Sequence, residues 1–154
     1  MFHLSLPVAA FSECIAFYRD CFEADIVMLS DQAANLYVFG GQLTLHDKPG
    51  SAIRAEQRQE MHFGHVVADA EWFAIRDRVQ SSAQAVLHCV EPVAEAGTRG
   101  KLLVVDPSGN IVEINSDLAV SNVKCNGFVV GGRGAEIFVE GFEWCTEVEY
   151  LARP

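Results

Sequence analysis

The chain has 154 residues, of which 50% are hydrophobic and 21% are charged, so it can form one folded domain with a sizeable core. This composition excludes an intrinsically disordered chain. With 11 Lys and Arg against 21 Asp and Glu, the net charge of −10 argues against nucleic acid or an anionic membrane surface as the partner.

The first 48 residues contain the signals of one strand, one helix and three further strands. The short apolar segment His3–Val8 predicts a strand. Apolar residues then recur at helical spacing over Phe11–Phe22, which predicts a helix. Three strands are expected to follow, over Asp25–Leu29, Asn35–Phe39 and Gln42–His46. Gly40 and Gly41 predict a tight hairpin turn between the last two strands.

After a polar linker over Asp47–Glu60, the same order of elements repeats. His62–Val67 predicts a strand, and Trp72–Val79 carries a helical pattern with Asp69 as the expected capping residue. Three strands then follow, over Val86–Val90, Lys101–Val105 and Asn110–Asn115. The last two strands are joined by the turn Asp106-Pro-Ser-Gly109. Both halves therefore have the predicted order β-α-β-β-β, with His3 and His62 at equivalent positions.

Residues 117–154 stand outside this repeat. Several glycines lie between Gly127 and Gly134, and apolar and polar residues alternate from Ala135 to Tyr150. This pattern is typical of strands, so we expect a C-terminal extension or an accessory hairpin.

The chain shows no sign of secretion, membrane insertion or cysteine cross-linking. No apolar run approaches the roughly 18–20 residues of a membrane span, and Met1 leads into His3 without a signal-peptide pattern. The five cysteines are an odd set without a C-x-x-C pair, which indicates neither a disulfide framework nor a zinc cluster. Reduced thiols are typical of the cytoplasm, so we expect a cytoplasmic protein.

The alternation within the strands predicts a cluster of metal-ligating side chains. Successive strand residues point to opposite faces, which places His3 and His62 opposite the apolar faces of their strands. Glu113 lies on the polar side of the last strand, opposite Val112 and Ile114. Two imidazoles and one carboxylate are the ligand set of a facial triad, which leaves open positions on a divalent metal ion. If the polar faces converge, His3, His62 and Glu113 form such a site.

Each of these residues also has a purely structural interpretation. A histidine near a terminus is commonly frayed, and a glutamate late in a strand commonly faces solvent. The equivalence of His3 and His62 in the repeat favours the metal site. His65 falls on the apolar face, so we interpret it as a core residue and not as a ligand.

Four segments resemble motifs of the vicinal oxygen chelate superfamily, which includes glyoxalases, extradiol dioxygenases and fosfomycin-resistance proteins. They are His3-Leu-Ser-Leu-Pro-Val8, Ile15-Ala-Phe-Tyr-Arg-Asp20, His62-Phe-Gly-His-Val-Val67 and Asp106-Pro-Ser-Gly-Asn-Ile-Val-Glu-Ile114. The resemblance implies an α+β fold over residues 1–116, in which βαβββ modules of about residues 1–48 and 61–116 form a curved mixed sheet around a metal cleft.

The resemblance also implies which residues form the site. His3, His62 and Glu113 would bind one divalent ion, with Fe, Mn, Ni or Zn as candidates. Thr44 stands where glyoxalase I enzymes supply a fourth ligand, and threonine is a poor ligand. His46 lies two residues further on the same face and is the candidate general base. Ser5, Thr44 and Asn115 are expected to face the substrate.

We therefore expect a metal-dependent enzyme whose small substrate chelates the ion through vicinal oxygens, either a dioxygenase or a glyoxalase-like lyase or isomerase. Two alternatives stay open. One is a metal-free protein that sequesters a drug as in bleomycin resistance, for which the charge of −10 suits a cationic ligand. The other is a fosfomycin-type thiol transferase. We also expect a homodimer, in which the modules pair within one chain or swap across the two chains.

Overall fold

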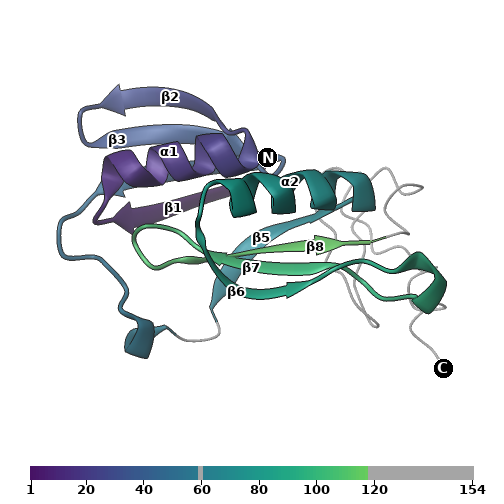
Figure 1. The fold of residues 1–154 in the computed structure, drawn as a ribbon. Coiled ribbons are helices and arrows are strands. Elements are labelled where there is room, and N and C mark those ends of the chain that lie inside the picture. The colour runs from purple at the N-terminus through teal and green to yellow at the C-terminus, as the bar shows by residue number, and fades with distance from the viewer. Residues whose placement is uncertain (59–60, 118–154) are drawn as a thin grey trace, which may run out of the picture.

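Two four-stranded mixed sheets, each covered on one face by a helix, make up the computed structural model, which describes residues 1–58 and 61–117 (Figure 1). The first module contains β1 (His3–Val8), α1 (Phe11–Phe22), β2 (Asp25–Ser30), β3 (Ala33–Val38) and β4 (Gly41–Asp47). The second contains β5 (His62–Val67), α2 (Asp69–Ser81), β6 (Ala85–Val90), β7 (Lys101–Val105) and β8 (Ile111–Ser116). Two short 3-10 helices, η1 (Ala55–Gln57) and η2 (Ala94–Ala96), lie in connections. The expected C-terminal extension lies, apart from Asp117, outside the described residues.

The two sheets have equivalent strand orders, which confirms the predicted βαβββ repeat. The orders are β1-β4-β3-β2 and β5-β8-β7-β6. In each sheet the first strand runs parallel to the last strand of its module, and the other pairs are antiparallel. β1 and β5 are therefore edge strands of two separate sheets.

Helices α1 and α2 cover the apolar faces of the two sheets and pack against each other (Figure 1). The buried core contains Phe17 and Leu45 in the first module and Trp72 and Ile114 in the second. The Trp72 indole N–H donates a hydrogen bond to the Ile114 carbonyl at 3.1 Å, which fixes α2 over β8. None of the described helices is long and apolar enough to cross a membrane.

The first strands of both modules alternate between an open face and a covered face, as predicted. His3 and Ser5 of β1 are exposed whereas Val8 is buried, and His62 of β5 is exposed whereas Val67 is buried. Each module therefore keeps one open sheet face, on the side opposite its helix.

Two local predictions are wrong by one residue. The turn between β3 and β4 uses Phe39 and Gly40, with φ values of +55° and +67°, and Gly41 is already the first residue of β4. Two-residue hairpin turns of this type need positive φ at both central positions, which is uncommon for Phe. Helix α2 begins at Asp69 itself, and the capping position is Ala68, which makes no side-chain cap.

A buried polar cluster at the Asp106-Pro-Ser-Gly109 turn joins the two modules. Ser108 Oγ accepts a hydrogen bond of 2.9 Å from the backbone N–H of Ala9, just before α1. The Tyr18 hydroxyl of α1 donates to Asp106 Oδ2 at 3.1 Å, and Asp106 Oδ1 accepts from the Ser108 N–H at 2.9 Å. Tyr18, Asp106 and Ser108 are all buried, so each polar group depends on its partners in the cluster.

This cluster predicts a loss of stability in alkali. Burial, and then the nearby Asp106, raises the pKa of the Cys14 thiol to about 12 and holds the pKa of Tyr18 well above 10. Unfolding restores ordinary pKa values near 9 and 10, so the stabilisation is present below about pH 9 and falls as the pH rises toward 12. Urea unfolding midpoints should fall between about pH 8 and 10.5, and less so in a Cys14→Ala, Tyr18→Phe double variant. The exposed Tyr37→Phe change is the control, and equal pH dependence in the double variant and wild type would contradict the prediction.

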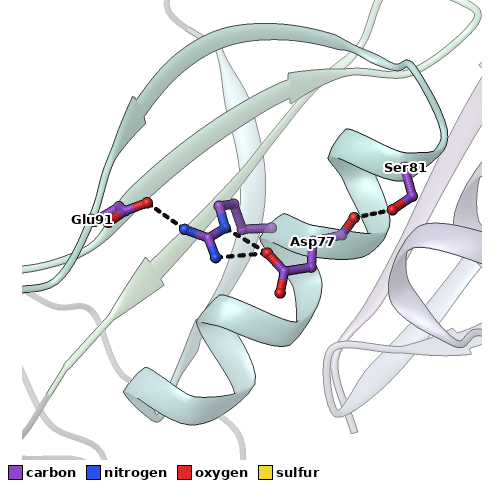
Figure 2. Close-up of polar contacts among 4 residues, drawn as sticks. Asp77, Ser81 and Glu91 are labelled. Carbon is purple, nitrogen blue, oxygen red and sulfur yellow. Dashed lines mark hydrogen bonds and ion pairs between the residues drawn. The ribbon is translucent and has the colours of Figure 1, made fainter.

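A surface network ties α2 to the end of β6. The Arg76 guanidinium contacts the carboxylates of Asp77 and of Glu91, which follows β6, and Figure 2 shows this bridge. The same guanidinium carbon lies 5.0 Å from the centre of the Phe73 ring. Ser81 donates to the Asp77 carbonyl at 2.8 Å near the end of α2 (Figure 2). These contacts lie on the helix side of the second module, opposite its open sheet face.

Candidate metal site

The open face of the second sheet carries a compact group of polar side chains. In the sheet register, Gly64 of β5 lies opposite Glu113 of β8, and Lys101 of β7 lies opposite Asn115. Because alternate residues of a strand share a face, His62, Glu113, Asn115 and Lys101 lie on the face opposite α2.

Glu113 is the centre of this group. Only 8% of the residue is exposed, and its two carboxylate oxygens have different neighbours. Oε2 lies 2.9 Å from His62 Nε2. Oε1 accepts a hydrogen bond of 2.6 Å from Asn115 Nδ2 and lies 3.5 Å from Lys101 Nζ. The carboxylate is therefore held through Oε1 and directs Oε2 toward the imidazole of His62.

A glycine permits this arrangement. A Cβ atom built on Gly64 would lie 1.7 Å from the backbone oxygen of Glu113 and 2.6 Å from its carbonyl carbon. These distances are far below van der Waals contact, so any side chain at position 64 displaces β5 from β8. The approach of the two strands that carry His62 and Glu113 depends on this glycine.

The open face of the first sheet carries a polar chain that begins at His3. His3 Nδ1 lies 3.1 Å from Gln42 Nε2, and the Gln42 amide donates to Thr44 Oγ1 at 3.2 Å. The Thr44 hydroxyl donates in turn to Asn35 Oδ1 at 2.8 Å. Contact through Nδ1 leaves the Nε2 atom of His3 as the ring nitrogen directed away from Gln42.

The other predicted site residues fall on both sheets. Ser5 is exposed on β1, opposite Thr44, which is only 5% exposed and uses its hydroxyl in the polar chain. His46 is half-buried on β4, on the same face as Thr44. Asn115 belongs to the second sheet, where its amide holds Glu113. His3, Ser5, Thr44 and His46 thus share one open face, and Asn115 shares the other with His62 and Glu113.

A single chain brings together two of the three predicted ligands. His62 and Glu113 are in contact, whereas His3 lies on the separate first sheet. Within residues 1–58 and 61–117 of a single chain, no three His, Cys, Asp or Glu side chains gather closely enough to hold a metal ion. A complete triad therefore requires a first-sheet face and a second-sheet face to be brought together.

Two neighbours of the predicted ligands were not singled out from the sequence. Lys101 lies beside Glu113, and Gln42 lies beside His3. The sequence did contain a signal for Lys101. An antiparallel hairpin closed by the Asp106-Pro-Ser-Gly109 turn pairs Lys101 with Asn115, which shares a face with Glu113. The signal for Gln42 is its place in the polar alternation of β4.

The contact between His62 and Glu113 fits a shared metal ion. Glu113 Oε2 is buried and accepts no hydrogen bond of ordinary geometry, although His62 Nε2 lies 2.9 Å away. Two ligand atoms about 2.1 Å from one ion, at right angles, lie about 3 Å apart. An imidazole nitrogen and a carboxylate oxygen are also suitable donors for Fe, Mn, Ni or Zn. The pair therefore fits one side of a divalent-metal site.

The fold and this pair define a two-module α+β protein with two of the three ligands of a candidate metal site on an open sheet face. No protein-family model and no curated protein matches the sequence. Solved structures do match. A glyoxalase/bleomycin resistance protein/dioxygenase from Alicyclobacillus acidocaldarius is 20% identical over 77% of this chain and 91% of its own, with a TM-score of 0.62. The fosfomycin resistance protein FosX from Listeria monocytogenes is 14% identical over 80% of this chain and 97% of its own, with a TM-score of 0.63.

A third similar structure is a lactoylglutathione lyase from Agrobacterium tumefaciens, with 22% identity over 75% of this chain and 92% of its own and a TM-score of 0.57. One structure of the Listeria FosX is a complex with Mn(II) and 1S,2S-dihydroxypropylphosphonic acid. The likeness confirms that the chain has the fold of the vicinal oxygen chelate superfamily, as its motifs predict.

Proposed function

We propose that the protein is a divalent-metal-dependent enzyme whose small substrate binds the ion through two adjacent oxygens. The observation that supports this proposal is the pair of His62 and buried Glu113, in contact at 2.9 Å on an open sheet face. The FosX complex with Mn(II) gives a precedent for a divalent ion in a protein of this fold. Fe, Mn, Ni and Zn are the candidate ions, and lyase, isomerase or dioxygenase activity are the candidate reactions.

The chain's own residues would hold the ion from both sides. His62 Nε2 and Glu113 Oε2 are the ligands from the second sheet, and Asn115 keeps Oε2 available by binding Oε1. His3 is the ligand from a first sheet, through Nε2, the ring nitrogen directed away from Gln42. A bound divalent ion would act as a Lewis acid that polarises the two substrate oxygens.

Residues of the first sheet would then act on the bound substrate. His46 lies on the same open face as His3 and is the candidate general base that accepts or returns a substrate proton. Ser5 is exposed on that face and can donate a hydrogen bond. Thr44 is engaged with Asn35, so it would position its neighbours and line the face without ligating the ion.

We further propose that His3 of one copy completes the site of a second copy in a homodimer. Among the described residues, β1 and β5 are edge strands of separate sheets, and an edge strand is a place where another chain can approach. Large apolar residues are exposed just before both strands, with Phe2 48% exposed and Met61 83% exposed. Exposed apolar side chains beside a site are typical of an interface. Pairing two copies about a two-fold axis would form two equivalent sites.

Metal content tests the ligand set. We expect wild-type protein to bind one Mn(II) per chain, and His62→Ala to weaken binding by roughly 100-fold or more because a ligand is lost. His65→Ala is the matched variant from the same strand. Its ring lies on the helix side, 6.1 Å from the Phe39 ring, and burial lowers its pKa. His65→Ala should keep the metal while losing stability. A folded His65 variant that loses Mn(II) would reverse the assignment.

A mixing experiment tests the completion of the site by a second copy. At a Mn(II) concentration that just saturates wild type, His3→Ala and His62→Ala homodimers should each bind little Mn(II), because every site lacks one ligand. If the site is shared between copies, a heterodimer of the two variants contains one intact site and one site that lacks both histidines. Random exchange should then restore roughly one quarter of the wild-type metal content. No restoration after verified exchange would show that each site draws its ligands from a single chain.

A metal-free sequestering protein is the second candidate, since the charge of −10 suits a cationic ligand and one similar structure is a glyoxalase/bleomycin resistance protein/dioxygenase. It predicts thermal stabilisation by a cationic glycopeptide of the bleomycin type without any metal. The likeness to FosX makes fosfomycin a further compound to test, with and without an added thiol. Thermal stabilisation of the protein by these compounds only after Mn(II) loading would favour the metal-dependent enzyme.

A further inference from the structure

Lys101 is the one Lys or Arg side chain beside the candidate ligands in the part of the chain that the structure describes. Its ammonium lies 3.5 Å from Glu113 Oε1, and its side chain is 44% exposed on the open face. The distance exceeds an ordinary N–H···O hydrogen bond, so the ion pair is loose. The same carboxylate oxygen already accepts the 2.6 Å hydrogen bond from Asn115. Lys101 therefore has donors that Glu113 does not use.

The charge at the site changes when a divalent ion binds. Without metal, the carboxylate of Glu113 balances the ammonium of Lys101. Two neutral imidazoles and one carboxylate leave a single positive charge on a divalent ion, and Lys101 adds a second beside it. This local excess of positive charge occurs in a chain with a net charge of −10, so it is a feature of the site and not of the whole surface.

We propose that Lys101 binds an anionic group of the substrate, so that the substrate class is a vicinal-oxygen chelator that also carries an acidic group such as a carboxylate. The inference rests on the proposed metal-dependent function. The ammonium reaches the site from the Oε1 side of Glu113, whereas His62 faces Oε2. Lys101 can thus contact the substrate without taking the place of a ligand. It is a specificity-determining residue, because it selects among molecules with the same chelating oxygens.

The test compares two probes that share one chelating head group. Catechol and 3,4-dihydroxybenzoate are titrated into the Mn(II)-loaded full-length protein, and their dissociation constants are measured by calorimetry. We expect wild type to bind the carboxylate-bearing probe about tenfold more tightly, as one additional partly exposed ion pair allows. Lys101→Met should remove most of this preference and leave catechol binding within about twofold, whereas Lys101→Arg should keep it.

The control is Lys48→Met, at an exposed lysine just after β4, which should keep the wild-type preference. Lys101→Met should also bind Mn(II) more tightly than wild type, because one positive charge beside the ion is removed. If Mn(II) binds but Lys101→Met retains the full preference, the role of Lys101 is wrong while the metal site stands. If wild-type protein binds no Mn(II), both proposals fail.

Discussion

Asp106→Ala is expected to lower the free energy of unfolding by about 3–5 kcal/mol, because it removes the centre of a buried hydrogen-bond cluster. Asp106 is 3% exposed and accepts hydrogen bonds from the Tyr18 hydroxyl, from the Ser108 N–H, and from both the N–H and the side-chain amide of Asn110. Alanine leaves the buried Tyr18 and Ser108 donors, and the half-buried donors of Asn110, without this acceptor. The loss is large because the same cluster joins α1 of the first module to the turn of the second.

Thermal and urea unfolding measure this effect, and a loss of this size corresponds to a fall in melting temperature of about 10 °C or more. Asp106→Asn should be intermediate, since it keeps one acceptor oxygen but turns an N–H donor toward other donors. Asp20→Ala is the control, because Asp20 is half-exposed and pairs with its exposed neighbour Arg19. An Asp106→Ala protein as stable as Asp20→Ala would show that the hydrogen bonds of Asp106 contribute nothing to joining the modules.

The fold could be predicted because its signals are local and occur twice. Period-two alternation in His3–Val8 and His62–Val67 assigned the faces of both edge strands, and the structure has the same assignment. The turn at Phe39 could not be placed because a left-handed Phe is tolerated there only by its surroundings, where its ring packs against Phe22 at 5.1 Å. The contact between Tyr18 and Asp106 spans 88 positions and has no local signal.

The candidate site likewise has one part that could be predicted from the sequence and one part that could not. The strand alternation placed His62 and Glu113 on one face, and the 2.9 Å contact between them follows from the parallel register of β5 and β8. The position of His3 relative to that pair depends on how two sheet faces are brought together. That association involves surfaces of more than one strand, such as exposed Phe2 and Met61, and alternation within a strand carries no information about it.

Gly64→Ala is expected to destabilise the protein by about 3 kcal/mol and to weaken Mn(II) binding by at least about tenfold. The added Cβ would lie 1.7 Å from the backbone oxygen of Glu113 and 2.9 Å from its nitrogen. Backbone atoms cannot rotate away as a flexible side chain does, so β5 and β8 must separate or slide. His62 is two residues from Gly64 on the same face, so the movement separates the two ligand atoms.

Ser5→Ala is the matched control, because Ser5 occupies the equivalent position on β1. Ser5 has a Cβ atom and lies opposite Thr44. Thr44 occupies the position in the first module that Glu113 occupies in the second. Ser5→Ala should change the melting temperature and Mn(II) affinity little, whereas Gly64→Ala should lower both. Because Ser5 already carries a Cβ atom opposite Thr44, the difference between the variants measures the closer approach of β5 to β8 that Gly64 permits. A Gly64→Ala protein with wild-type stability and Mn(II) affinity would mean that β5 and β8 are further apart in solution, and that His62 and Glu113 need no glycine to meet.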